Sequence, residues 1–102
     1  MITTFVKRYQ QAVAAVALNP TTLTALSVAQ QGKFRYADIQ VQTADVRVTF
    51  DNSTDPVAAT TGQVWYTGKT YRVWGLTTFN NLKAIRDTTT SAVLVIDCWG
   101  EA

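Results

Sequence analysis

The stretch ADIQVQTADVRVTFD, from Ala37 to Asp51, decides the fold class because it alternates apolar and polar residues over two successive runs. Over residues 37–42, Ala, Ile and Val alternate with Asp and Gln. Over residues 46–51, Val and Phe alternate with Arg, Thr and Asp. Successive side chains of a β-strand point to opposite faces of a sheet, so each run predicts a strand with one apolar and one wet face.

Short apolar runs separated by turn residues continue downstream of that stretch. Asp51 to Pro56 is rich in Asp, Asn and Ser, whose side chains bond nearby backbone, and it predicts a turn. Gln63 to Tyr66 and Thr70 to Leu76 flank Gly68 and predict the two strands of a hairpin. Two further strands are expected after it: Leu82 to Arg86, and Ser91 to Trp99. About seven or eight short antiparallel strands predict an all-β, jelly-roll-like β-sandwich.

The length of 102 residues predicts a single domain, residues 1–102, whose N-terminal segment fits two structures. The apolar residues at positions 2, 5, 6, 9, 13 and 16 fall on one face of a helix, and this periodicity slightly favours a helix. The same stretch also fits a strand that reaches Leu18 and ends in a turn at Asn19 and Pro20.

The expected last strand differs from the others because residues 92–96 are all apolar. Such a strand has both faces covered, whereas a small two-sheet sandwich covers only one face of each strand. We expect either the N-terminal segment, residues 1–18, or a neighbouring subunit to cover the second face. Only the second of these alternatives, the neighbouring subunit, would make the protein an oligomer.

Charge and hydropathy lower the expectation for two classes of partner. Nine basic and seven acidic residues give a formal charge of +2, and the two kinds are interleaved along the chain. Nucleic-acid binders usually concentrate basic charge on one face, so we expect no nucleic acid as a partner. No apolar run reaches the length of a membrane span and the N-terminus lacks the order of a signal peptide, so we expect no membrane partner.

The chain offers little catalytic chemistry. It has no His and a single Glu, which removes most general acid–base options and the commonest metal ligand. No nucleophile elbow and no glycine-rich phosphate loop occurs. Asp51, Ser53 and Asp55 are spaced like the start of a calcium loop, but Pro56 and Gly62 occupy the positions where Gly and Glu are needed. We expect a protein that is not an enzyme and has no metal or cofactor.

The only cysteine, Cys98, excludes an internal disulfide and fits a small buried hydrophobe better than a reactive thiol. More informative is the aromatic stretch QVWYTGKTYRVWG, from Gln63 to Gly75. Alternation along its two expected strands places aromatic rings on both faces of the hairpin. A core role is the first interpretation, a protein interface the second, and stacking on a sugar or on single-stranded bases the third.

The order of elements over residues 33–100 resembles that of small β-sandwich virion proteins of tailed bacteriophages. Such sequences have a strand like residues 44–51, a polar turn leading to a Pro, and then a Gly and an apolar strand like residues 62–66. A Gly turn, a strand, a Leu leading into a Lys/Ile/Arg segment like residues 82–86, and an apolar strand near the C-terminus follow. Asn52 and Val57 stand where these sequences often have Gly and Thr, and Asn tolerates the left-handed conformation that Gly supplies.

This resemblance implies a strand from Tyr9 to Leu18, against the helical periodicity, and we adopt the strand. It also implies a non-enzymatic structural protein that is made in the bacterial cytoplasm and cements or decorates the capsid exterior. Its partners would be the major capsid protein and its own copies, as a homo-dimer or homo-trimer. A neck, tail or fibre component is the alternative within the virion, and a small carbohydrate-binding module on Trp65, Trp74 or Trp99 is the alternative from another class.

For the interface we select residues that one small core does not have to absorb. They come from the N-terminal segment and from the aromatic stretch: Phe5, Arg8, Tyr9, Trp65 and Trp74.

Overall fold

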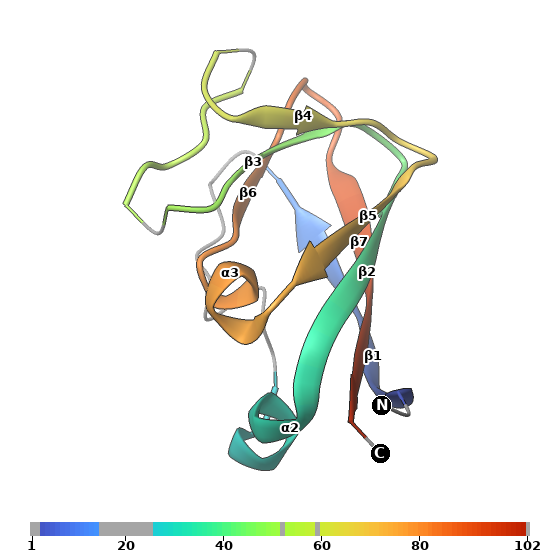
Figure 1. Cartoon of the computed structure of the whole chain (residues 1–102). Coiled ribbons are helices and arrows are strands. Elements are labelled where there is room, and N and C mark those ends of the chain that lie inside the picture. The colour runs from blue at the N-terminus through green and yellow to red at the C-terminus, as the bar shows by residue number, and fades with distance from the viewer. Residues whose placement is uncertain (1–2, 15–25, 52, 59, 102) are drawn as a thin grey trace.

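Two antiparallel sheets face each other in the structure, a computed structural model that describes residues 3–14, 26–51, 53–58 and 60–101 (Figure 1). One sheet has the strand order β1-β7-β2-β5, and the other has the order β4-β3-β6. The strands are β1 (Thr3–Val13), β2 (Phe34–Gln42), β3 (Val46–Thr49), β4 (Gln63–Trp65), β5 (Thr70–Trp74), β6 (Lys83–Arg86) and β7 (Ala92–Glu101). The predicted all-β sandwich is confirmed.

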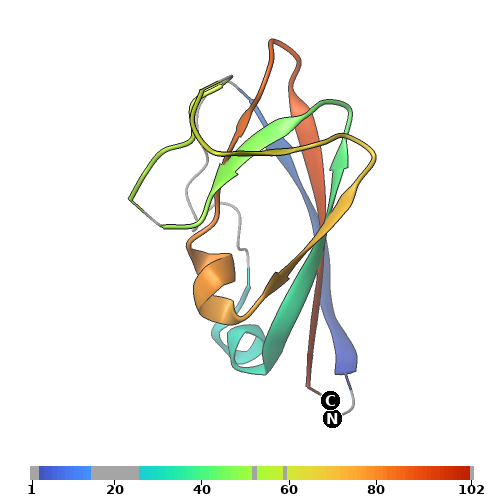
Figure 2. The same ribbon diagram turned by 45° about the horizontal axis from the view of Figure 1, so that its top comes forward.

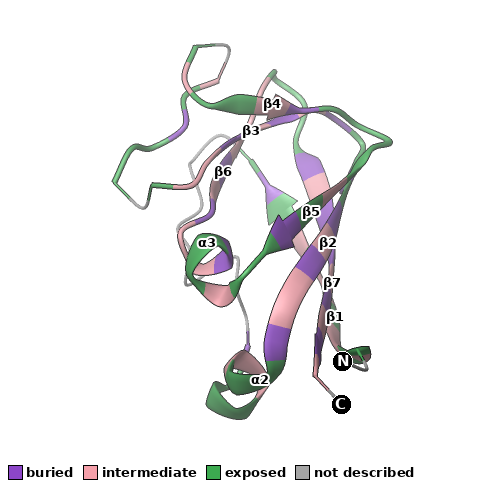
Figure 3. Cartoon of the chain, viewed as in Figure 1, coloured by how far each residue is buried: buried purple, intermediate pink, exposed green. Residues whose placement is uncertain are grey.

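Alternate strand residues build the core between the two sheets (Figure 3). Along β7 the even-numbered residues from 92 to 100 are buried, and the odd-numbered residues are half-exposed. In β2, Ala37, Ile39 and Val41 are buried, whereas Asp38 between them is not. The thiol of Cys98 is in the core, as expected. Burial of this apolar set is the main favourable contribution to folding.

The N-terminal segment forms a strand, so its helical periodicity was misleading. β1 pairs with β7 along its whole length, from Thr3 opposite Glu101 to Val13 opposite Ala92. A bulge interrupts the register between Phe5 and Lys7. Pairing with a long apolar partner strand outweighs a weak local helical pattern. β1 ends at Val13, one residue before the described range stops, and residues 15–18 of the predicted strand lie outside the described residues.

β1 lies beside β7 within the sheet, so it does not cover the second face of β7 as one expectation had it. That face points away from the three-stranded sheet, and Figure 2 shows no ribbon of the described residues beyond it. We call it the outer face. The neighbouring subunit that was the other expected cover stays a prediction.

The predicted hairpin is wrong in its pairing. The turn forms, with the N–H of Lys69 donating to the carbonyl of Tyr66 at 3.2 Å, but β4 pairs with β3 and β5 pairs with β2. Figure 2 shows β4, in yellow, and β5, in orange, diverging from the turn. The rings of Trp65 and Tyr71 stack between them at 4.7 Å, and the Tyr71 hydroxyl accepts the N–H of Tyr66 at 2.8 Å. This aromatic pair therefore lies where a hairpin would have backbone hydrogen bonds between β4 and β5.

Two short helices, α2 (Val28–Lys33) and α3 (Leu76–Asn80), were not predicted. Ser27 and Gln30 form a capping box at the start of α2, a signal present in the sequence. α3 follows β5 directly and buries Phe79, whose ring stacks on Phe34 at 4.8 Å. No helix within the described ranges is long and apolar enough to cross a bilayer.

Candidate functional site: the outer face of the four-stranded sheet

The first feature of the outer face is a row of aromatic side chains that crosses all four strands. The register places Phe5 beside Trp99, Trp99 beside Tyr36, and Tyr36 beside Trp74. Successive ring centroids are 5.4, 6.5 and 4.8 Å apart. The side chains at the two ends are the most exposed, with Phe5 at 47% and Trp74 at 61% of their accessible surface. We call these four residues the aromatic row.

A charged row lies next to the aromatic row, in the order Arg8, Asp97, Asp38, Arg72. Two nitrogens of Arg8 donate to the Asp97 carboxylate at 2.5 and 2.9 Å, and two of Arg72 donate to Asp38 at 2.8 and 3.1 Å. These bonds raise the pKa of both guanidinium groups above the usual value. The two carboxylates sit opposite each other on β2 and β7, and their repulsion is offset by an Arg on each side.

The two rows are joined through Arg72. Its guanidinium carbon lies 4.1 Å from the centre of the Tyr36 ring and 5.5 Å from that of the Trp74 ring. Cation–π contact of this kind holds the planar groups of both rows in one arrangement. A third ion pair, Arg35 with Glu101, lies near the end of the sheet. Each of these three cations is matched by one carboxylate, so the face has no excess of positive charge.

Beyond the charged row the outer face is hollowed by a polar depression of about 470 Å³. Its lining includes the amides of Gln10, Gln40 and Gln42 and the hydroxyl of Thr70. The side-chain amide of Gln42 donates through Nε2 to the side-chain Oε1 of Gln40 at 3.1 Å. Amides and carboxylates at fixed spacing offer many donors and acceptors to a ligand.

Three of the five predicted interface residues meet on the outer face, namely Phe5, Arg8 and Trp74. Tyr9 lies on the inner side of β1, partly buried against the core. Trp65 is 3% exposed and lies in the core. Tyr36, an inner member of the aromatic row, was not among the predicted interface residues. Alternation with Asp38 indicated its face, but only the strand register shows which rings are its neighbours.

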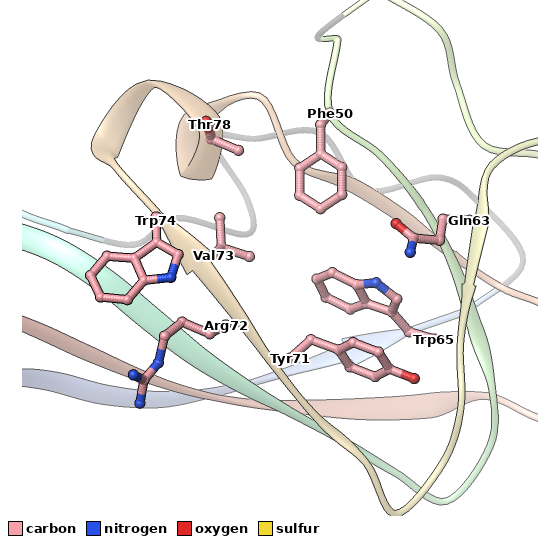
Figure 4. Close-up of a pocket in the computed structure, with 8 residues that line it drawn as sticks. All are labelled: Phe50, Gln63, Trp65, Tyr71, Arg72, Val73, Trp74 and Thr78. Carbon is pink, nitrogen blue, oxygen red and sulfur yellow. The ribbon is translucent and has the colours of Figure 1, made fainter.

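A second opening lies at the edge of the sandwich, between β4 and β5 (Figure 4). This seam cavity has a volume of about 390 Å³, and its lining residues are Phe50, Gln63, Trp65, Tyr71, Arg72, Val73, Trp74 and Thr78. Its lining is mainly apolar and aromatic. The Trp65 ring has Tyr71 on one side and Phe50 at 5.8 Å, so little of its own surface is free for stacking.

Two further side chains that can ionise, Cys98 and Asp51, have structural roles. Burial, and secondarily the charge of Asp97, raises the pKa of the Cys98 thiol to about 12. Hydrogen bonds from the Thr54 side chain, and then from the backbone N–H groups of Thr54 and Ser53, lower the pKa of Asp51 to about 2. Asp51 therefore closes the predicted turn, although Asn52 within it lies outside the described residues. Within the described ranges, no three His, Cys, Asp or Glu side chains are grouped as metal ligands.

Comparison of the chain with protein-family models, with curated proteins and with solved structures finds no match.

Proposed function

We propose that the chain is a non-enzymatic structural protein of a bacteriophage virion, of the cement or decoration type, that binds neighbouring capsid subunits through its outer face. The observation that carries the proposal is the aromatic row, exposed on a sheet face that no described element covers. Exposed apolar patches of this kind are typical of protein interaction sites. The assignment to a virion rests on the resemblance in the order of elements over residues 33–100.

The composition of the face supports a protein partner over a nucleic acid. Trp, Tyr and Arg are the residues that dominate interface hot spots, and the outer face combines all three. Nucleic-acid affinity comes largely from cations that replace counterions on phosphates. On the outer face Arg8, Arg72 and Arg35 are each held by a carboxylate, so they offer little net attraction to a polyanion.

Repetition is the mechanism by which such a protein would stabilise a particle. Each copy would bury its aromatic row against neighbouring capsid subunits, and the same contact would recur at every equivalent position of the shell. Contacts of modest individual strength then act together, because every copy engages surfaces already held in place by the shell. No catalytic step is needed for this function.

The test is the number of copies per particle, measured by quantitative mass spectrometry of purified virions of the phage that encodes the chain. A copy number in simple ratio to the major capsid protein is the expected result. A few copies per particle would instead indicate the neck, tail or fibre alternative. Absence from the particle would contradict the virion proposal.

A small carbohydrate-binding module is the second candidate, favoured by the polar depression on the same face, across the charged row from the aromatic row. Trp74 and Trp99 would stack on sugar rings, while the amides and carboxylates of the depression would bond hydroxyl groups. Trp65, the third tryptophan first considered for this role, is buried. Glycans should then change tryptophan fluorescence of a monomeric protein, whereas a cement protein should be oligomeric and insensitive to them.

A further inference from the structure

Strand β5 has a free backbone edge. It is the last strand of its sheet and pairs only with β2 among the described residues. The N–H of Val41 donates to the carbonyl of Lys69 at 3.0 Å, and the N–H of Gly75 donates to the carbonyl of Arg35 at 2.8 Å. Antiparallel bonds alternate along a strand, so the odd-numbered residues of β5 face β2. The backbone groups of Thr70, Arg72 and Trp74 therefore point away from the sheet.

The seam cavity lies directly beside this free edge. Arg72 is among its lining residues although its side chain is bound to Asp38 on the outer face, as expected if its backbone faces the cavity. Val73, on the inner side of β5, lines the cavity together with Trp65 of β4 and with Phe50, which follows the end of β3 (Figure 4). A strand added to β5 would therefore place its inward side chains in an apolar space.

The charged row sets the chemistry of the residue that would lie opposite Arg72. In an antiparallel addition, that residue shares a backbone bond pair with Arg72 and points to the outer face. The row already reads Arg, Asp, Asp, Arg and ends on a cation at this edge. Arg72 donates to Asp38 through Nε and Nη2. An acidic residue on the other side of Arg72 would accept from Nη1, a local cross-strand pair that needs no net positive charge on the face, and its two neighbours would point into the cavity.

We propose that the free edge of β5 and the seam cavity together bind an extended segment of a partner protein with the pattern apolar–acidic–apolar. The segment adds as a fifth strand of the sheet, an instance of recognition by strand addition. Its acidic residue pairs with Arg72, and an apolar neighbour enters the cavity between Phe50, Trp65 and Val73. This binding uses an edge of the sheet rather than its outer face, so it does not depend on the proposed function.

A second copy of the chain fits this site poorly. The two edge strands of the four-stranded sheet are β1 and β5, and both end the charged row with an arginine. Edge-to-edge pairing that keeps the rows aligned would set Arg72 against Arg8 or Arg72 of the other copy. Asp38 and Asp97 already place two like charges opposite each other in this row, each balanced by an arginine. An arginine opposite Arg72 would gain no cross-strand attraction, whereas an acidic residue would. The occupant is therefore a different chain.

The probe is an acetylated and amidated heptapeptide, Thr-Thr-Val-Asp-Val-Thr-Thr, titrated into the ¹⁵N-labelled full chain and followed by NMR. We expect saturable shifts of the backbone amides of Thr70, Arg72 and Trp74 and of the Trp65 indole. A peptide with Lys in place of Asp should bind about fivefold more weakly. A peptide methylated on the Asp amide nitrogen loses a backbone bond and should bind roughly tenfold more weakly.

Two protein variants test the cavity. Thr78→Phe, on α3, fills it and should weaken the peptide about tenfold. Thr77→Phe is the matched control, because Thr77 is also exposed on α3 but does not line the cavity, and it should bind as the parent does. Gln63→Phe blocks the cavity from β4 if the first variant fails to fold. The proposal is overturned by no saturable shift, by shifts confined to other strands, by equal binding of the methylated peptide, or by equal binding to blocked and control variants.

Discussion

The inner and the outer face of the four-stranded sheet are built from alternate residues of the same strands, yet different interactions organise them. On the inner face the even-numbered residues of β7 pack against the core, and the gain grows with apolar area removed from water. On the outer face, rings and ion pairs line up in rows whose members each contribute roughly 0.2–1 kcal/mol. We therefore expect the inner face to set the stability and the outer face to tolerate substitutions without unfolding of the protein.

The largest expected effect is a difference in stability between the alanine variants of two tryptophans that lie nine positions apart in the sequence. Trp65 is 3% exposed and stacks on Tyr71, so Trp65→Ala should lower the free energy of unfolding by about 3–5 kcal/mol. Trp74 is 61% exposed, so Trp74→Ala should cost less than about 1 kcal/mol. Urea denaturation followed by circular dichroism measures both. Equal losses would remove the distinction between core and surface rings.

A smaller effect is expected where the inner face meets α2. A Cβ added at Gly100 would overlap the carbonyl oxygen of Lys33 and lie 3.0 Å from a methyl of Val6. Gly100→Ala should therefore destabilise the protein by about 1–3 kcal/mol, the usual range for overpacking. Gly32→Ala is the control, because a Cβ there meets nothing within 4 Å and Ala favours a helix. A neutral Gly100→Ala would show that this part of the inner face is loosely packed.

Trp99→Ala tests whether the outer face is separable from stability. Its ring lies in the middle of the aromatic row, between Phe5 and Tyr36, so its loss should cost the fold only about 1 kcal/mol. Binding to particles, measured by co-sedimentation, should drop at least tenfold because central interface residues carry most of the affinity. Val64→Ala, a change on β4 away from this face, is the control. Unchanged binding of Trp99→Ala would place the docking surface elsewhere.

The last expected effect is a pH dependence, and its source, the Cys98 thiol, lies on the inner face. Below pH about 8.5 the Cys98 thiol is neutral in the folded and the unfolded chain. Its folded pKa is raised to about 12, so between these values the unfolded chain loses the proton while the folded chain keeps it. Stability should therefore fall as the pH rises through this window. Cys98→Ala should show a shallower fall in urea midpoint from pH 8 to 10.5, and identical slopes would contradict the assignment.

The local sequence pattern was sufficient to predict secondary structure where the alternation within one segment determines whether that segment is a strand or a turn. Residues 37–42 lie in β2, residues 46–49 in β3, and the turn at Asp51 closes as its composition indicates. It failed where long-range pairing decides. The N-terminal segment has a helical period, yet β7 pairs with it as a strand, and the hairpin expected around Gly68 splits between two sheets.

The candidate site shows the same division. Alternation assigns Asp38 and Arg72 to the faces opposite Ile39 and Val73, and residue type made Trp74 a candidate for an interface. Nothing local indicates that Phe5 lies beside Trp99, because the two residues are 94 positions apart and meet only through the register of β1 on β7. A bulge between Phe5 and Lys7 further shifts which residues face outward.

The sequence by itself determined the β class and, for most strands, which residues face the core, because side-chain direction along a strand has a period of two that any segment displays alone. Only the tertiary structure decided which strands are neighbours. That choice created the aromatic row, the charged row and the seam cavity. Such neighbours come from register between distant segments, which is set by the packing of the whole sandwich and has no counterpart in a local pattern.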